Sequence, residues 1–118
     1  MTLSDCYNLF GGDYTEVHDR LCKDELIQKY LLRFVELNEF VALRDALNRE
    51  DYEKADLAAY SIMVSSLHLG FPALHESAEQ LRAVIDSRNT DDIEAFAEKT
   101  KAEYDVVYNA IQQYAAEM

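Results

Sequence analysis

The stretch AAYSIMVSSLHLGFPAL, residues 58–74, decides the fold of this chain. Its apolar residues recur at helical spacing as far as Leu69. Gly70 then suits the residue just past a helix end, and Pro72 suits the first position of a new helix. The stretch therefore predicts a helix, a tight turn and a second helix that runs back beside the first.

Further amphipathic helices are predicted on both sides of this turn. They are expected over residues 2–10, 14–21, 25–37, 39–51, 52–69, 72–88 and 93–118, with polar capping residues before several of them. The chain has only three Gly and one Pro, and it shows no strand pattern. We therefore expect an all-α protein of one domain, residues 1–118. Its architecture would be an antiparallel four-helix up-down bundle with additional short N-terminal helices as a cap.

The net charge and the cysteine spacing disfavour several classes of ligand. The net charge of −12 disfavours binding to nucleic acid or to an anionic membrane surface. No apolar run approaches the ~20 residues that span a bilayer, and the start lacks the pattern of a signal peptide, so we expect a cytoplasmic protein. Cys6 and Cys22 would then be reduced thiols, and we expect both in the core. Their spacing indicates no metal and no cofactor.

The helix over residues 52–69 has apolar side chains on two opposite faces. At ~100° per residue, one face carries the mostly small residues Ala55, Ala58, Ala59, Ile62, Ser66 and Leu69. The opposite face carries Leu57, Tyr60, Met63, Val64 and Leu67. A surface helix needs only one apolar face, so either neighbouring helices surround this one or its second face is exposed for a partner.

The run from Ala59 to Leu74 resembles a family motif. The histidine-containing phosphotransfer (HPt) domains of bacterial phosphorelays carry roughly Ala-His-x-Leu-Lys-Gly, followed by Leu-Gly-(Phe or Ala)-x-x-Leu. The residues that match this motif here are Ala59, Ile62, Leu69, Gly70, Phe71 and Leu74. The earlier segments LFGGDYTEVHDRL and LIQKYLLRFV also resemble the lead-in helices of the family. The resemblance implies an HPt-type bundle.

The reactive positions of the motif are changed. Tyr60 stands where the family has its phosphorylated His, Met63 where it has Lys, and Val64 where it has Gly. Tyrosine has a reference pKa of ~10 against ~6.5 for histidine, and its phosphate ester would be a poor donor to aspartate. Met63 removes a cation that would hold phosphate, and Val64 adds bulk where a partner approaches. We therefore expect that phosphotransfer is lost and that the chain is not an enzyme.

Three histidines are alternatives as phosphoacceptor. His68 lies two turns beyond Tyr60 at the rim of the same face, and it ranks above His75 and His18. A histidine near a helix C-terminus is also explained by the helix dipole, which favours its cation there. A metal site on His68 and His75 has no third ligand.

Four functions remain open from the sequence. The first is a degenerate HPt domain that binds a response-regulator receiver domain or a histidine kinase. Its partner-binding residues would be Leu57, Tyr60, Met63, Val64, Leu67 and His68. The second is a homodimer formed through the same face. The third is active phosphotransfer through His68, and the fourth is a scaffold whose N-terminal helices bury Tyr60 and Met63.

Overall fold

The chain forms seven helices and no strand, which confirms the predicted all-α class. The computed structural model describes all residues, 1–118. The helices are α1 (Leu3–Leu9), α2 (Tyr14–Leu21), α3 (Asp24–Leu37), α4 (Glu39–Asn48), α5 (Tyr52–Leu69), α6 (Pro72–Ile85) and α7 (Thr90–Ala116). None of the seven helices combines the length and the hydrophobicity that a membrane span requires.

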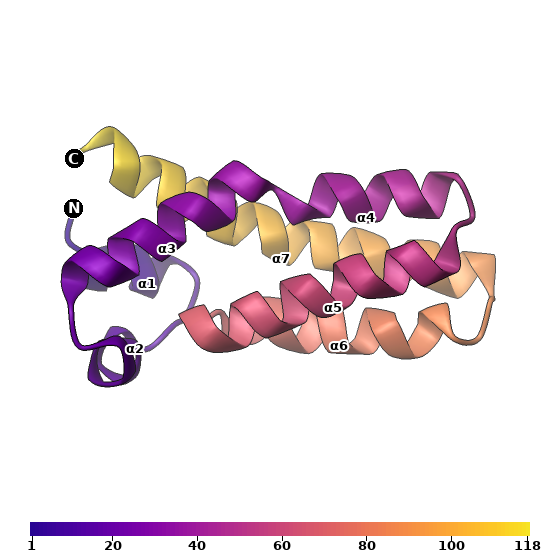
Figure 1. Ribbon diagram of the computed structural model, residues 1–118, viewed down its shortest axis with the longest axis horizontal. Helices are drawn as coiled ribbons and strands as arrows, with labels where there is room; N and C mark the ends of the chain where they lie inside the picture. Colours follow the sequence, from indigo (N-terminus) through magenta and orange to yellow (C-terminus); the bar gives the residue numbers. More distant parts are fainter.

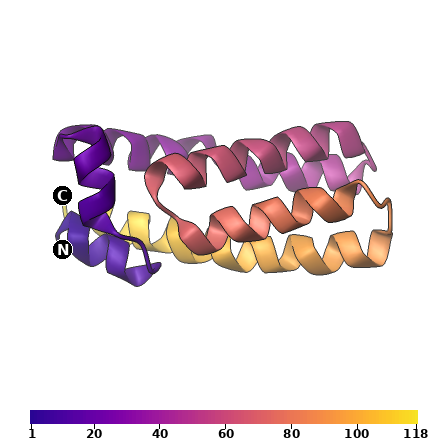
Figure 2. The ribbon, with the colours of Figure 1, turned by 90° about the horizontal axis from the view of Figure 1, so that it is seen from below.

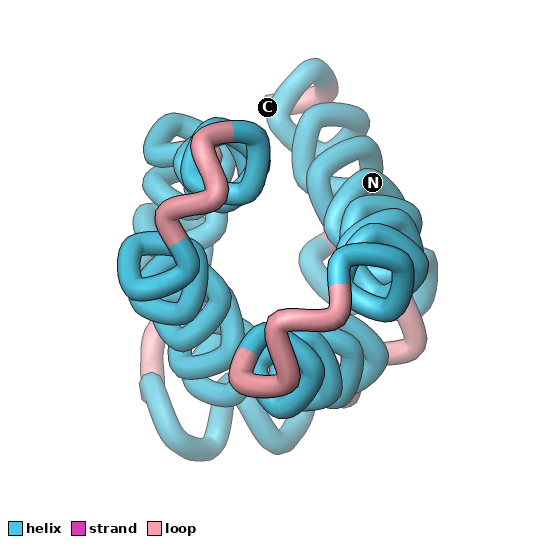
Figure 3. The backbone as a smooth tube through the Cα atoms, turned by 90° about the vertical axis from the view of Figure 1, so that its right-hand side faces the viewer, coloured by secondary structure: helices cyan, strands magenta, loops and turns pink.

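Helices α3 to α7 lie along the long axis of the molecule. In Figure 1, α3 and α4 follow one another along one side, and α5, α6 and α7 then run beside them with a reversal at each turn. The molecule measures 41 × 24 × 19 Å, and the two short helices α1 and α2 gather at one end. Figure 2 shows α2 at this end, next to the turn that joins α5 and α6. Figure 3 looks along the long axis, where the helices surround a common interior.

Local sequence sets most of the helix ends. Asp13, Asp51 and Asn89 each accept a hydrogen bond from the backbone N–H three residues later, as expected for N-cap residues. Asn38 takes a left-handed backbone conformation with a φ of 42°, which separates α3 from α4. The predicted ends of α4 and α6 are too late by three residues each. Left-handed residues at Glu50 and Arg88 turn the chain there before the next helix begins.

The turn from α5 to α6 is built as the sequence predicts and is held by the N-terminal cap. Gly70 has a φ of 79° and Pro72 is the first residue of α6. The Tyr7 hydroxyl donates a 2.7 Å hydrogen bond to the carbonyl of Leu69. A Cβ on Gly70 would lie 2.5 Å from Cγ2 of Val17, so α2 also packs closely on this turn. The cap thereby fixes the end of α5.

The core corrects two sequence predictions. Cys6 is buried, and its thiol contacts the carbonyl of Ala110, but Cys22 is exposed at the end of α2. Helical spacing predicts one broad apolar face on α3, made of Leu26, Ile27, Tyr30, Leu31, Phe34 and Leu37. Of these, Ile27, Leu31 and Phe34 are buried. Leu26 is half-buried, whereas Tyr30 and Leu37 are exposed by 40% and 55%. The face is wider than the contact with the other helices, and its edge remains at the surface.

Candidate functional site

One of the two apolar faces of α5 is buried, and the other lies largely at the surface. The inner face is buried and consists of Ala55, Ala59, Ile62, Ser66 and Leu69. Its small side chains let α4 and α6 pack closely on α5, and the Ser66 hydroxyl is satisfied by a 2.6 Å hydrogen bond to the carbonyl of Ile62. This face is fully explained by the fold.

The outer face remains at the surface; it comprises Leu57, Tyr60, Met63, Val64, Leu67 and His68. The exposed fractions of Leu57, Tyr60 and Leu67 are 62%, 47% and 56%. Met63 and Val64 are half-buried between them, and His68 is exposed. Large apolar side chains gathered on one helix face in this way are typical of an interaction surface. The alternative in which the N-terminal helices bury Tyr60 is wrong, because Tyr60 is exposed and α2 reaches the last turns of α5, where Arg20 donates to the carbonyl of Leu67.

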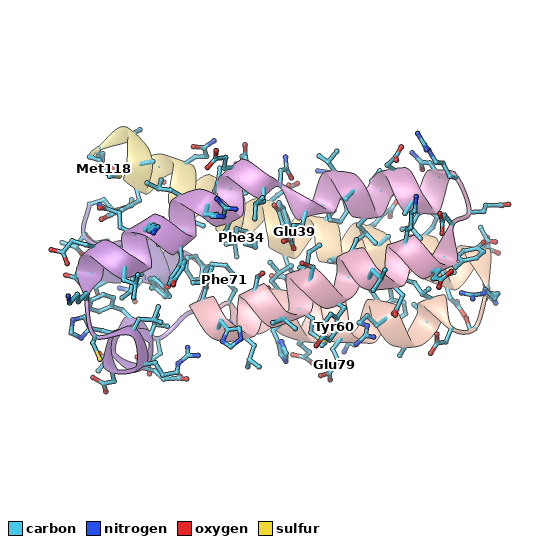
Figure 4. The ribbon with its side chains drawn as sticks, in the orientation of Figure 1. Phe34, Glu39, Tyr60, Phe71, Glu79 and Met118 are labelled. Carbon is cyan, nitrogen blue, oxygen red and sulfur yellow. The ribbon has the colours of Figure 1, made fainter.

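Tyr60 has a cation beside it that sequence reasoning missed. The guanidinium of Arg82, on α6, lies 4.8 Å from the centre of the Tyr60 ring. Two hydrogen bonds of 3.0 and 3.2 Å tie the same guanidinium to the carboxylate of Asp56. Hydrogen bonding to Asp56 raises the pKa of Arg82, so the cation stays charged. Figure 4 shows Tyr60 on α5 and Glu79 on the neighbouring helix α6, which carries Arg82.

The turn at Gly70 explains why Arg82 meets Tyr60. In two antiparallel helices, residues at similar distances before and after the turn lie side by side. Tyr60 precedes Gly70 by about as many residues as Arg82 follows it, so the predicted helix pair could have placed Arg82 near Tyr60, although not over its ring. The cation beside Tyr60 is therefore supplied by α6 and not by α5 itself.

The three histidines lie in separate places. The ring of His75 is half-buried, with Nδ1 2.9 Å from the carbonyl oxygen of Met63 and Nε2 3.8 Å from Glu79. His18 lies 3.7 Å from Asp24 at the N-terminal end. His68 is exposed on the rim of the outer face, as predicted. No three His, Cys, Asp or Glu side chains come together in a group that could hold a metal ion.

A groove between α3 and α5 adjoins the outer face. Its volume is about 440 Å³, and its walls are mostly apolar. The residues along it are Leu21, Tyr30, Arg33, Phe34, Leu37, Glu39, Val64, Ser65, His68 and Leu69. Tyr30 and Leu37, the two exposed residues of the apolar face of α3, line this groove. Val64 and His68 belong to both the groove and the outer face, so the two surfaces are continuous.

Comparison of the chain with family models, with curated proteins and with solved structures found no match.

Proposed function

We propose that this chain is an HPt-like domain that has lost phosphotransfer and acts by binding a receiver domain or a histidine kinase. The observation that carries the proposal is the position of Tyr60. It stands at the phosphoacceptor position of the resemblance and lies on the outer face of α5 together with Met63 and Val64. In HPt domains the corresponding face is the one that docks a receiver domain.

The arrangement of the helices supports an HPt-type scaffold. We assign α3 with α4, α5, α6 and α7 to the four positions of an antiparallel up-down bundle, and α1 and α2 to a cap on one end. The Leu69-Gly70-Phe71 turn joins the second and third positions, as the motif requires. Phe71 is buried among the aromatic rings of Tyr7, Phe10 and Phe34, which ties this turn to the cap.

The chemistry of the outer face favours binding over group transfer. A tyrosine hydroxyl is protonated at neutral pH, so it is a weak nucleophile towards an aspartyl phosphate. Arg82 is the nearby cation, but two of its three guanidinium nitrogens, Nε and Nη2, already donate hydrogen bonds to Asp56. An exposed face with an aromatic ring, a methionine and two leucines instead matches the composition of an interface core. The proposed setting is the cytoplasm, where receiver domains and kinases of phosphorelays act.

Self-association is the second candidate, and the exposure of Leu57 and Leu67 is the observation that favours it. A two-fold axis over the outer face would bury both leucines against their copies. The mass of the protein in solution, measured by light scattering over a range of concentrations, distinguishes a dimer from a monomer. A monomer that binds a receiver domain supports the first candidate.

The loss of phosphotransfer is tested by phosphorylating a receiver domain from the same cell with labelled phosphate and incubating it with the chain. The native chain should stay unlabelled. The variant Tyr60→His/Met63→Lys/Val64→Gly should acquire acid-labile label, because the scaffold is intact and the nucleophile is restored. Label on the native chain would contradict the proposal, and His68→Ala would then identify whether His68 carries it.

Binding is tested separately by titrating the native chain with the unphosphorylated receiver domain in a calorimeter. The double variant Leu57→Ser/Leu67→Ser should weaken binding at least tenfold, because it removes two exposed apolar contacts from the interface. The matched control Val41→Ser/Val106→Ser changes two exposed apolar residues on other helices and should leave binding unchanged. Equal effects of both double variants would contradict the assignment of the outer face.

A further inference from the structure

The groove between α3 and α5 contains one charged atom that the fold leaves without a partner. Oε2 of Glu39 is buried and has no hydrogen-bond partner in the protein, although Arg33 lines the same groove. The only other buried side-chain oxygen or nitrogen without a partner is the hydroxyl of Tyr104. A buried carboxylate oxygen is normally paired. Glu39 as a whole is half-buried and lines the groove, so a basic group that enters the groove can approach its carboxylate.

Glu39 is fixed in this position by the break between two helices. Asn38 turns the chain in a left-handed conformation, and Glu39 then becomes the first residue of α4. A carboxylate is favoured at a helix N-terminus by the dipole. In Figure 4, Phe34 and Glu39 point from the α3–α4 segment towards α5 rather than away from it. The carboxylate therefore faces a groove with apolar walls.

The charge of this carboxylate acts on Tyr104, but the Tyr104 hydroxyl makes no hydrogen bond to it. Burial, with a smaller contribution from the charge of Glu39, raises the pKa of Tyr104 to about 12. The phenol is therefore neutral at physiological pH, and it can offer Glu39 at most one neutral hydrogen bond. It cannot neutralise the charge of the carboxylate.

We propose, building on the docking function above, that the groove takes an amphipathic helix of the partner protein that carries one Lys or Arg on its apolar side. The apolar residues of that helix lie on Tyr30, Leu37 and Val64, and its basic side chain reaches the carboxylate of Glu39. A groove between two helices with apolar walls is a recurrent site for an amphipathic helix. A charge-assisted hydrogen bond in a desolvated groove supplies selectivity for the basic residue. The net charge of −12 also attracts a basic segment.

The probe for this proposal is a pair of synthetic amphipathic helical peptides of equal net charge. One has Lys at the centre of its apolar side. The other has norleucine there and the Lys moved to its polar side, so general attraction to the acidic protein is the same for both. Each is titrated into the isotopically labelled protein, and the backbone amide shifts are followed by NMR. The first peptide should shift the amides of the groove residues and bind about tenfold more tightly than the second.

The variant Glu39→Gln should abolish the tenfold preference, because it keeps the shape and removes the charge. Glu36→Gln is the matched control: Glu36 is an exposed acid on the last turn of α3, and its removal changes the net charge equally. That variant should keep the preference. The proposal is overturned if the two peptides bind the native chain equally, if the shifts lie outside the groove, or if both variants act alike. Equal binding is the result expected if Glu39 pairs internally with Tyr104.

Receiver binding separates this proposal from the function proposed above. If the receiver domain binds the native chain and Glu39→Gln leaves its affinity unchanged, the docking function stands and the role of Glu39 is overturned. If the Lys peptide binds in the groove through Glu39 but no receiver domain or kinase binds, the groove is confirmed as a site for a basic helix and the phosphorelay function is wrong.

Discussion

The inner and outer faces of α5 are both apolar, yet only one of them contributes to the core. The inner face carries small residues such as Ala55 and Ala59, and it is buried against α4 and α6. The outer face carries larger residues such as Leu57 and Tyr60, and it stays at the surface. Side-chain size is what distinguishes them: small residues allow helices to approach, and large exposed ones supply contact area to a partner. Hydrophobicity by itself does not separate a core from a docking surface.

The largest expected effect is the loss of stability on truncating a side chain of the inner face, and truncation of a side chain of the outer face is its control. Ile62→Ala should lower the free energy of unfolding by about 3 kcal/mol, because it leaves a cavity in the core. Leu57→Ala should change it by less than about 0.5 kcal/mol, because the side chain is mostly in water already. Urea unfolding followed by circular dichroism measures both. A large loss from Leu57→Ala would show that the outer face is buried in solution, as in a dimer.

The next largest effect concerns the turn where the N-terminal cap holds the end of α5. Gly70→Ala should lower the free energy of unfolding by about 2–3 kcal/mol, because it strains a left-handed residue and drives a methyl group into Val17. Gly11→Ala is the matched control. Gly11 is also left-handed, with a φ of 72°, but its surroundings are open, so it should cost only the backbone part, about 1 kcal/mol. Equal losses would mean that α2 does not pack on the turn.

Alkaline pH should weaken the core through the buried thiol of Cys6. Burial raises the pKa of the Cys6 thiol to about 11, from the 9.0 of an exposed thiol. The folded chain therefore holds this proton more tightly than the unfolded chain does. The stability that this thiol contributes is complete below pH 9.0 and is lost as the pH rises towards 11, on the order of 2 kcal/mol. Urea unfolding across this range should show a loss that is smaller in Cys6→Ala; an identical loss in that variant would assign the effect to other groups.

The smallest effect is expected at the ion pair beside Tyr60. Arg82→Met should lower the free energy of unfolding by less than about 1 kcal/mol, because the Arg82–Asp56 pair is partly exposed to water. Lys101→Met, which removes a more exposed pair with Asp105, should cost still less. The same urea titration resolves the two. A loss from Arg82→Met comparable with that from Ile62→Ala would mean that this pair is part of the core rather than of the docking surface.

The turns and helix starts were predictable because their causes are local. Asp13, Asp51 and Asn89 cap helices with their own side chains, and Gly70 permits a backbone conformation that other residues resist. The two apolar faces of α5 were predictable for the same reason, since helical periodicity fixes which residues share a face. Which residues of one helix share a face follows from their spacing alone, without tertiary information.

The candidate site was only partly predictable. The residues of the outer face follow from helix geometry, but the groove depends on how far α3 stands from α5. Cys22 was expected in the core, and Leu37 belongs to the apolar face predicted for α3. Both are exposed, because an apolar residue is buried only if another helix reaches it. Arg82 and Glu39 come from other helices, and periodicity within α5 contains no information about them.

The sequence by itself determined the helical class and the turn at Gly70, because helical periodicity and turn residues are properties of short stretches. The tertiary structure alone decided which face of α5 is covered, that Arg82 lies over the Tyr60 ring and that the carboxylate of Glu39 faces an apolar groove. These three depend on distances between helices. Such distances are set by the packing of many side chains at once, and no single stretch of sequence contains them.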